Sequence, residues 1–320
     1  MEEDRLGRQS KVGAVTPEQT KKIIEENSYR EELIFVSGEP TLNPNLPDFV
    51  AHAKTCGFRT VGVISNGRRF SYMPYAAKLV KKGMNLAILS IHGGNARLHD
   101  GLVRTPGAFD EVKKGLANLS QLKQYSSLRI NTSTVLNRRN TSTEALNELM
   151  DLLLPHVDHI VFNVMQPFGR GLTHFDRLMM SYTEVADAVG DFFKSRKDER
   201  LPVFLVDIPH CVTEDKGIPD RARGYVERYA RYQIDRQTDK PKDRDSTGGA
   251  PVRKELLAEG KEVEIKGLEL KHRDKQEESK KARRAECDDC AYSHVCDGVW
   301  KNYIERHGWK EFEPILLAAD

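Results

Sequence analysis

Apolar residues in this chain gather in short runs that are separated by longer amphipathic stretches. Six runs rich in β-branched and aromatic residues lie at 33–36, 60–65, 86–91, 128–135, 159–164 and 202–209. They lack clean polar alternation, as do parallel strands that are buried on both faces. The sequence therefore predicts an α/β fold with a parallel sheet.

The stretches between these runs carry helix signals. Thr16–Gln19, Thr141–Glu144 and Ser181–Glu184 are predicted capping boxes. Gly57 and Gly83 follow amphipathic runs and are predicted to end two helices. Successive strands lie roughly 25–40 residues apart, which suits right-handed βαβ units. Five or six such units form a barrel or part of one.

The segment 235–286 has a different composition. It contains 15 Lys or Arg and 13 Asp or Glu in 52 residues, with no Phe, Trp or Tyr. Mixed charges of this kind are typical of a solvated surface element. Within it, Val263, Ile265, Leu268 and Leu270 flank Lys266-Gly267, a pattern that predicts a short hairpin.

Composition narrows the class of protein. The 320 residues include 50 Lys or Arg and 48 Asp or Glu, a net charge of +2, which argues against a nucleic-acid partner. The sequence has neither an apolar run long enough to span a membrane nor a signal peptide, so the expected compartment is the cytoplasm. In that compartment a tight group of cysteines indicates a metal site rather than disulfides.

Small polar residues and glycines follow five of the predicted strands. In a parallel barrel, ligands bind at the carboxyl ends of the strands. Each group could instead serve only its own turn. Their repetition favours a polar small-molecule cofactor across the barrel mouth. The five groups are Ser37–Thr41, Ser65–Arg68, Ser90–Gly94, Asn131–Ser133 and Asn163–Pro167.

Two longer stretches that contain several of these residues resemble the core of radical S-adenosylmethionine (SAM) enzymes. They are "SGEPTLNPNLPDFVAHAKTCGFRTVGVISNG" and "LSIHGGNARLHDGLVRTPGAFDEVKKGLANL". The resemblance implies that Gly38–Thr41 binds the ammonium group of SAM, whose three donors need acceptors. It implies that Ser90 and Asn131 contact the ribose or carboxylate of SAM, with Ser65 and Asn66 nearby. The implied cofactor-binding residues are Gly38, Glu39, Pro40, Thr41, Ser65, Asn66, Ser90 and Asn131.

The sequence departs from this family in one respect. The family's CxxxCxxC motif, whose thiolates hold the catalytic 4Fe–4S cluster, is absent. The first predicted strand matches the family's second strand, so we expect a partial (β/α)6 TIM-like barrel that lacks its first strand. We expect an N-terminally truncated chain; the alternative is a degenerate homologue that has lost the cluster. Either way, the chain as printed is not expected to generate the radical.

A small Cys-rich extension ends the chain. Cys287, Cys290 and Cys296 lie within ten residues, a spacing that suits soft metals or iron–sulfur clusters. The spacing resembles the SPASM and twitch extensions of radical SAM enzymes, which hold auxiliary 4Fe–4S clusters. The resemblance implies that Cys211 is a fourth ligand, although an open iron site is also possible in that family.

Zinc is the rival metal in this extension, with His294 or His307 as a further ligand. Trp300, Tyr303 and Trp309 are expected to pack the extension onto the barrel. The predicted parts are therefore a barrel at 1–210, a ligand loop, helix and charged linker with a hairpin at 211–286, and a Cys-rich auxiliary-cluster tail at 287–320.

The resemblance implies an enzyme that cleaves SAM reductively and abstracts hydrogen from a substrate. The substrate would be a peptide or a small molecule in cofactor biosynthesis, and a flavodoxin or ferredoxin would donate the electron. The alternative is a non-catalytic barrel with a zinc-stabilised tail that acts as an accessory protein.

Overall fold

The structure is a computed structural model that describes residues 15–197, 200–223, 253–256, 262–265, 280–293, 296 and 298–316. Its main body is a six-stranded parallel sheet in which the spatial order of the strands equals their order in the chain. The strands are β1 (Glu32–Phe35), β2 (Thr60–Ser65), β3 (Leu86–Ser90), β4 (Arg129–Leu136), β5 (His159–Val164) and β6 (Val203–Val206). An unreversed order of this kind is that of a partial barrel, so the predicted α/β fold class is confirmed.

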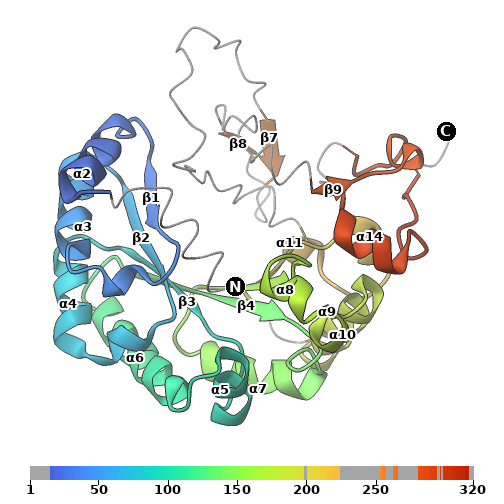
Figure 1. The fold of residues 1–320 in the computed structure, drawn as a ribbon, viewed down its shortest axis with the longest axis horizontal. Helices are drawn as coiled ribbons and strands as arrows, with labels where there is room; N and C mark the ends of the chain where they lie inside the picture. Colours follow the sequence, from blue (N-terminus) through green and yellow to red (C-terminus); the bar gives the residue numbers. More distant parts are fainter. Residues whose placement is uncertain are drawn as a thin grey trace, which may run out of the picture.

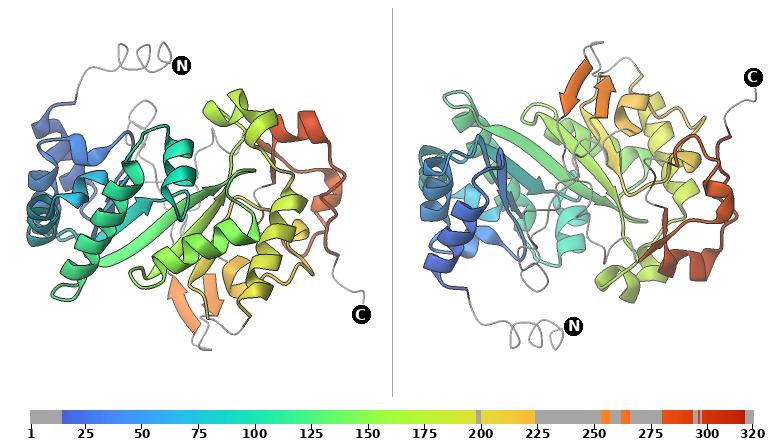
Figure 2. Two further views of the ribbon diagram at one scale, coloured as in Figure 1. Left: turned by 90° about the horizontal axis from the view of Figure 1, so that it is seen from below. Right: turned by 90° about the horizontal axis from the view of Figure 1, so that it is seen from above.

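Helices cover the outer side of the curved sheet (Figures 1 and 2). The longer ones are α2 (Pro17–Glu26), α3 (Leu46–Thr55), α4 (Met73–Lys81), α5 (Ala96–Val103), α6 (Ala108–Lys123), α7 (Thr143–Leu153) and α10 (Tyr182–Ser195). Short helical turns are η1 (Pro40–Leu42), η2 (Arg68–Ser71), α8 (Arg170–Thr173), α9 (Phe175–Leu178), η3 (His210–Val212) and α11 (Asp220–Arg223). No helix in the described ranges is long and apolar enough to cross a membrane.

The predicted helix ends agree with the structure except at α7. Capping boxes are present at Thr16 with Gln19 and at Ser181 with Glu184. Gly57 and Gly83 follow their helices with φ of 95° and 111°. The box predicted for Thr141–Glu144 is wrong. Ser142 caps α7 instead, because the Thr141 hydroxyl donates to the Asn137 carbonyl.

The register of the strands separates two faces of the sheet. Side chains on the face toward the helices, such as Val61, Val63 and Ile130, are fully buried. The opposite, concave face carries Ser90 and Ser133, which pair across β3 and β4 and are only partly buried. The concave face is therefore the one open to a ligand. Strand β1 is an edge of the sheet, and within the described residues it pairs only with β2.

The C-terminal part packs beside the second half of the barrel, as Figure 1 shows. It contains β9 (Lys281–Ala282), η5 (Ala285–Cys287), β10 (Val299–Trp300) and α14 (Lys301–His307). The fully buried Tyr303 lies 4.7 Å from the Tyr182 ring, centroid to centroid. The Glu311 carboxylate accepts hydrogen bonds from the backbone N–H and the hydroxyl of Thr183, at 2.7 and 2.8 Å, in the first turn of α10.

Trp300 and Tyr303 are buried, and Trp309 is half-buried against the same core. The expectation that these aromatic residues hold the tail on the barrel is confirmed.

The charged segment contains a two-stranded antiparallel sheet of β7 (Arg253–Leu256) and β8 (Glu262–Ile265). Val263 and Ile265 therefore lie on a strand, as predicted. Within the described residues, β8 pairs with β7. Leu268 and Leu270 lie outside the described residues.

Candidate functional site

The turn after β1 is organised around the carboxylate of Glu39. Ser37 and Gly38 both have left-handed φ angles, 74° and 58°, which reverse the chain between the strand and η1. Oε1 of Glu39 accepts hydrogen bonds from the Thr41 N–H, the Thr41 hydroxyl and the Ser65 hydroxyl, at 3.1, 2.7 and 2.8 Å. Oε2 accepts the Asn66 N–H at 2.8 Å.

These contacts connect the ends of β1 and β2 through one charged group. A carboxylate offers about four lone-pair sites, two on each oxygen, so Oε2 keeps room for one further donor.

The same contacts define the positions of Thr41 and Ser65. Thr41 is fully buried, and its carbonyl accepts from Arg69 at 2.6 Å and Tyr75 at 3.0 Å. Ser65 faces the helix side and also accepts the Gly67 N–H at 3.0 Å. Both hydroxyls therefore position Glu39 and are not turned toward the concave face.

A polar stripe crosses the middle of the concave face. Ser90 pairs with Ser133 across β3 and β4, and Asn131 lies two residues before Ser133 on the same face. The amide of Asn163, on β5, donates to the Ser133 hydroxyl at 2.8 Å. The side-chain oxygen of Asn131 is buried without a hydrogen-bond partner in the described structure. Such a group is costly to leave unpaired, so it is suited to receive a ligand donor.

His92 lies at one end of this stripe, two residues after β3. Its Nδ1 accepts the Val135 N–H at 3.2 Å, which leaves Nε2 as the protonated nitrogen of the neutral ring. Burial and, to a smaller extent, the nearby His99 together lower the pKa of His92 to about 4. His92 is therefore a neutral hydrogen-bond donor near neutral pH.

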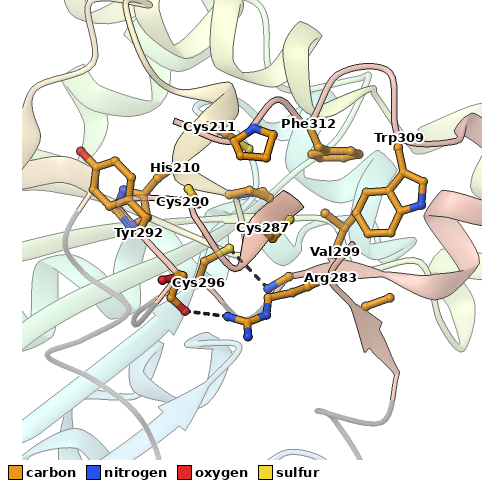
Figure 3. Close-up of a pocket in the computed structure, with 15 residues that line it drawn as sticks. His210, Cys211, Arg283, Cys287, Cys290, Tyr292, Cys296, Val299, Trp309 and Phe312 are labelled. Carbon is orange, nitrogen blue, oxygen red and sulfur yellow. Dashed lines mark hydrogen bonds between the residues drawn. The ribbon is translucent and has the colours of Figure 1, made fainter. Parts of the chain in front are cut away.

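The four predicted metal ligands line one pocket beyond the carboxyl end of β6 (Figure 3). Cys211 comes from η3, and Cys287, Cys290 and Cys296 come from the tail. All four sulfur atoms are turned toward the same space in Figure 3. None of the five cysteines of the chain forms a disulfide. The fifth, Cys56, ends α3 with its sulfur 3.7 Å from His52 Nε2, away from this pocket.

The thiols affect one another electrostatically. Burial and, to a smaller extent, the neighbouring Cys296, Cys290 and Cys287 together raise the pKa of Cys211 to about 12. A bound cation would reverse this effect, because it stabilises thiolates. Within the part of the chain that is described, no group of three or more His, Cys, Asp or Glu side chains is arranged to hold a metal ion. The donor set suits a cluster, which four thiolates hold around several iron atoms, but metal binding would require the sulfurs to converge.

Four neighbours complete the pocket, and the sequence did not point to them. The Gly298 N–H donates to Cys296 Sγ at 3.4 Å. Gly298 has a φ of 85°, and a Cβ there would lie 2.4 Å from the Ala282 carbonyl oxygen. Arg283 lines the pocket and donates to the Ser293 carbonyl at 2.6 Å. The His210 ring stacks on Tyr292 at 4.3 Å. These contacts depend on the docked tail and have no local sequence signal.

The two histidines proposed for zinc have different outcomes. His307 stacks between Tyr303 and Phe175, with centroid distances of 4.6 and 5.5 Å, and does not line the cysteine pocket. Its expected role as a zinc ligand is therefore wrong in this fold. His294 lies outside the described residues.

Comparison with known proteins supports the family resemblance seen in the sequence. Residues 4–153 match the Radical SAM superfamily. The resemblance to radical SAM enzymes is therefore confirmed for these residues.

Curated relatives include an "AdoMet-dependent heme synthase" of Methanosarcina barkeri, 27% identical over 62% of this chain and 55% of that protein. An "Fe-coproporphyrin III synthase" of the same organism is 24% identical over 56% of this chain and 44% of that protein. The chain thus spans about half the length of these relatives. A crystal structure of a radical SAM methyltransferase from Sphaerobacter thermophilus aligns with a TM-score of 0.43 and 15% identity, over 62% of this chain and 57% of that chain.

Proposed function

We propose that this chain forms the SAM-binding barrel and the auxiliary-cluster site of a radical SAM enzyme that acts in cofactor biosynthesis. The observation that carries the proposal is the meeting of Cys211 with the three tail cysteines in one pocket beside a radical SAM barrel. The names of the relatives, which are heme and coproporphyrin synthases, support a cofactor-building role.

The residues proposed to hold SAM are those on the concave side of the strand ends. The ammonium group would meet the turn at Ser37–Pro40 and the remaining acceptor site on Glu39 Oε2. The unpaired Asn131 oxygen would accept from a ribose hydroxyl, with Ser90 beside it. Thr41 and Ser65 would act by holding the Glu39 carboxylate in place. When bound with a reduced cluster, SAM supplies radical chemistry to the site.

The residues proposed to hold the auxiliary cluster are Cys211, Cys287, Cys290 and Cys296. Four thiolates are the usual ligand set of a 4Fe–4S cluster. The Gly298 N–H would stabilise one thiolate, and the Arg283 guanidinium would offset part of the negative charge. The substrate would be a small molecule, and an acidic redox protein such as a flavodoxin or ferredoxin would supply electrons.

Anaerobic reconstitution with iron and sulfide tests this proposal. The chain should take up about four iron and four sulfide ions, because only four of its five thiols share a pocket. Cys211→Ser should lower both values and change the visible absorption of the cluster. Cys56→Ser is the matched control and should leave them unchanged.

Two outcomes would contradict the proposal. Zinc without sulfide in anaerobically purified protein would support a zinc-stabilised accessory protein instead. A second cluster, or equal iron content in the Cys211 and Cys56 variants, would show that these four thiols are not the ligands.

A further inference from the structure

A second hollow lies at the amino end of β6, away from the strand ends that carry Glu39 and Cys211. It is formed by the end of α10, the residues before β6 and the segment that leads into α11, and its volume is about 480 Å³. Volumes of this size are typical of small-molecule sites. Among the described residues, its lining is strongly basic: Phe193, Lys194, Arg196, Lys197, Arg200, Gly217, Pro219 and Arg221.

Five acidic residues around the hollow already have cationic partners. Asp191 pairs with Lys194 at 3.2 Å, and Asp187 pairs with Lys216 at 2.6 Å. The remaining pairs are Asp151 with Arg196, Glu214 with Arg223 and Asp220 with Arg223. These carboxylates are therefore not available to neutralise the other cations of the lining.

Three basic side chains of the lining have no acidic partner among the described residues. Lys197, Arg200 and Arg221 make no hydrogen bond or ion pair in the described part of the structure. The Nε of Arg221 is also buried without an acceptor. A buried donor of this kind costs free energy unless a ligand supplies the acceptor. The hollow thus combines space, positive charge and an unpaired buried donor.

We propose that this hollow binds a small ligand that carries a multiply charged oxyanion group, held by Lys197, Arg200 and Arg221. The planar fork of a guanidinium matches both phosphate and carboxylate oxygens. Phe193, at the edge of the core, offers an apolar surface to the rest of the ligand. The chemistry is shared by phosphorylated and polycarboxylated metabolites, and it is independent of SAM and of the cysteine pocket.

Isothermal titration calorimetry of the full chain with pyrophosphate and, separately, with citrate tests this inference. At least one anion should bind, and a rise in salt concentration should weaken the binding because screening reduces charge attraction. Preference for pyrophosphate or citrate identifies the phosphorylated or the carboxylated class. Arg200→Gln and Arg221→Gln should each raise Kd about tenfold or more, since each removes a charge-assisted contact.

Controls separate binding from folding. Arg177→Gln removes a positive charge from α9, outside the hollow, and should bind like the wild type. Arg221→Lys should bind with intermediate affinity, because it keeps the charge and loses the fork. Arg200 is exposed, so its substitution should leave the far-UV circular dichroism and the melting temperature unchanged even if Arg221→Gln unfolds.

The inference is overturned if neither anion binds, or if the Arg200 and Arg221 variants bind like the wild type. Asp198 and Glu199 lie outside the described residues. Binding that occurs only in the variant D198N/E199Q would also overturn it, because the cations would then be neutralised within the chain.

Discussion

Replacement of Glu39 by Gln tests the interpretation of the β1 turn. The amide oxygen of Gln can keep the three hydrogen bonds that Oε1 accepts from Thr41 and Ser65. Its NH2 group then faces the Asn66 N–H, which lies 2.8 Å from Oε2 in the wild type, so two donors meet. Loss of one hydrogen bond to a charged group costs about 1.5–3 kcal/mol.

We therefore expect Glu39→Gln to lower the free energy of unfolding by about 2 kcal/mol. For a domain of this size that corresponds to a fall in Tm of about 4–8 °C. Urea unfolding, followed by circular dichroism, measures the change directly. The control is Glu31→Gln, which removes an ion pair with Arg59 whose side chains are 77% and 76% exposed. A pair so exposed contributes about 0.2–1 kcal/mol.

The same variant separates structural support from cofactor binding. Titration of SAM into Glu39→Gln at a temperature where the variant is folded should show weaker binding than in the wild type. If Glu39→Gln and Glu31→Gln lose the same stability, the carboxylate does not organise the turn. If SAM binds both variants equally well, Glu39 has no part in the ammonium site.

Two further predictions concern the tail and its pocket. Lys281→Met leaves the buried Asp207 carboxylate without the ammonium that lies 3.0 Å away in the wild type. It should lower the free energy of unfolding in urea by about 3 kcal/mol or more. The double variant with Asp207→Asn should recover part of that loss, whereas additive effects of the two substitutions would show that the pair does not interact. Burial raises the pKa of Cys211 from 9.0 to about 12, so the metal-free folded chain keeps a proton that the unfolded chain releases. The free energy of unfolding should therefore fall as pH rises above about 9. Cys211→Ser should reduce that fall. If the stability of Cys211→Ser depends on pH as that of the wild type does, the fall is not caused by the Cys211 thiol.

The sheet could be predicted because its strands are buried on both faces and stand out as apolar runs. The run at 159–164 coincides with β5, and the run at 128–135 differs from β4 by one residue at each end. Burial on both faces also prevents the sequence from showing which face a single side chain points to. In β2 the residues on both faces are apolar or small, so alternation does not reveal that Ser65 faces the helices.

Partners across the sheet were harder to predict than the elements themselves. Glu39 was expected to meet a ligand ammonium, yet most of its acceptor sites are filled by Thr41, Ser65 and Asn66. Two of these donors come from the neighbouring strand end and depend on tertiary register. The N-cap of α7 moved from Thr141 to Ser142 for a similar reason, since a buried loop carbonyl competes for the Thr141 hydroxyl.

The buried ion pair of Asp207 and Lys281 explains how two segments that are far apart in the sequence contribute cysteines to the same pocket. Asp207 follows β6, has a left-handed φ of 62° and accepts the amide of Gln166 at 2.5 Å. Lys281 lies on β9, directly before the pocket residues Ala282 and Arg283. The side chains of the pair are only 11% and 9% exposed, so breaking this ion pair in the interior would be costly. This pair fixes the segment of Cys211 against the segment of the tail cysteines, and Lys281→Met should therefore lower iron uptake although neither residue is a ligand.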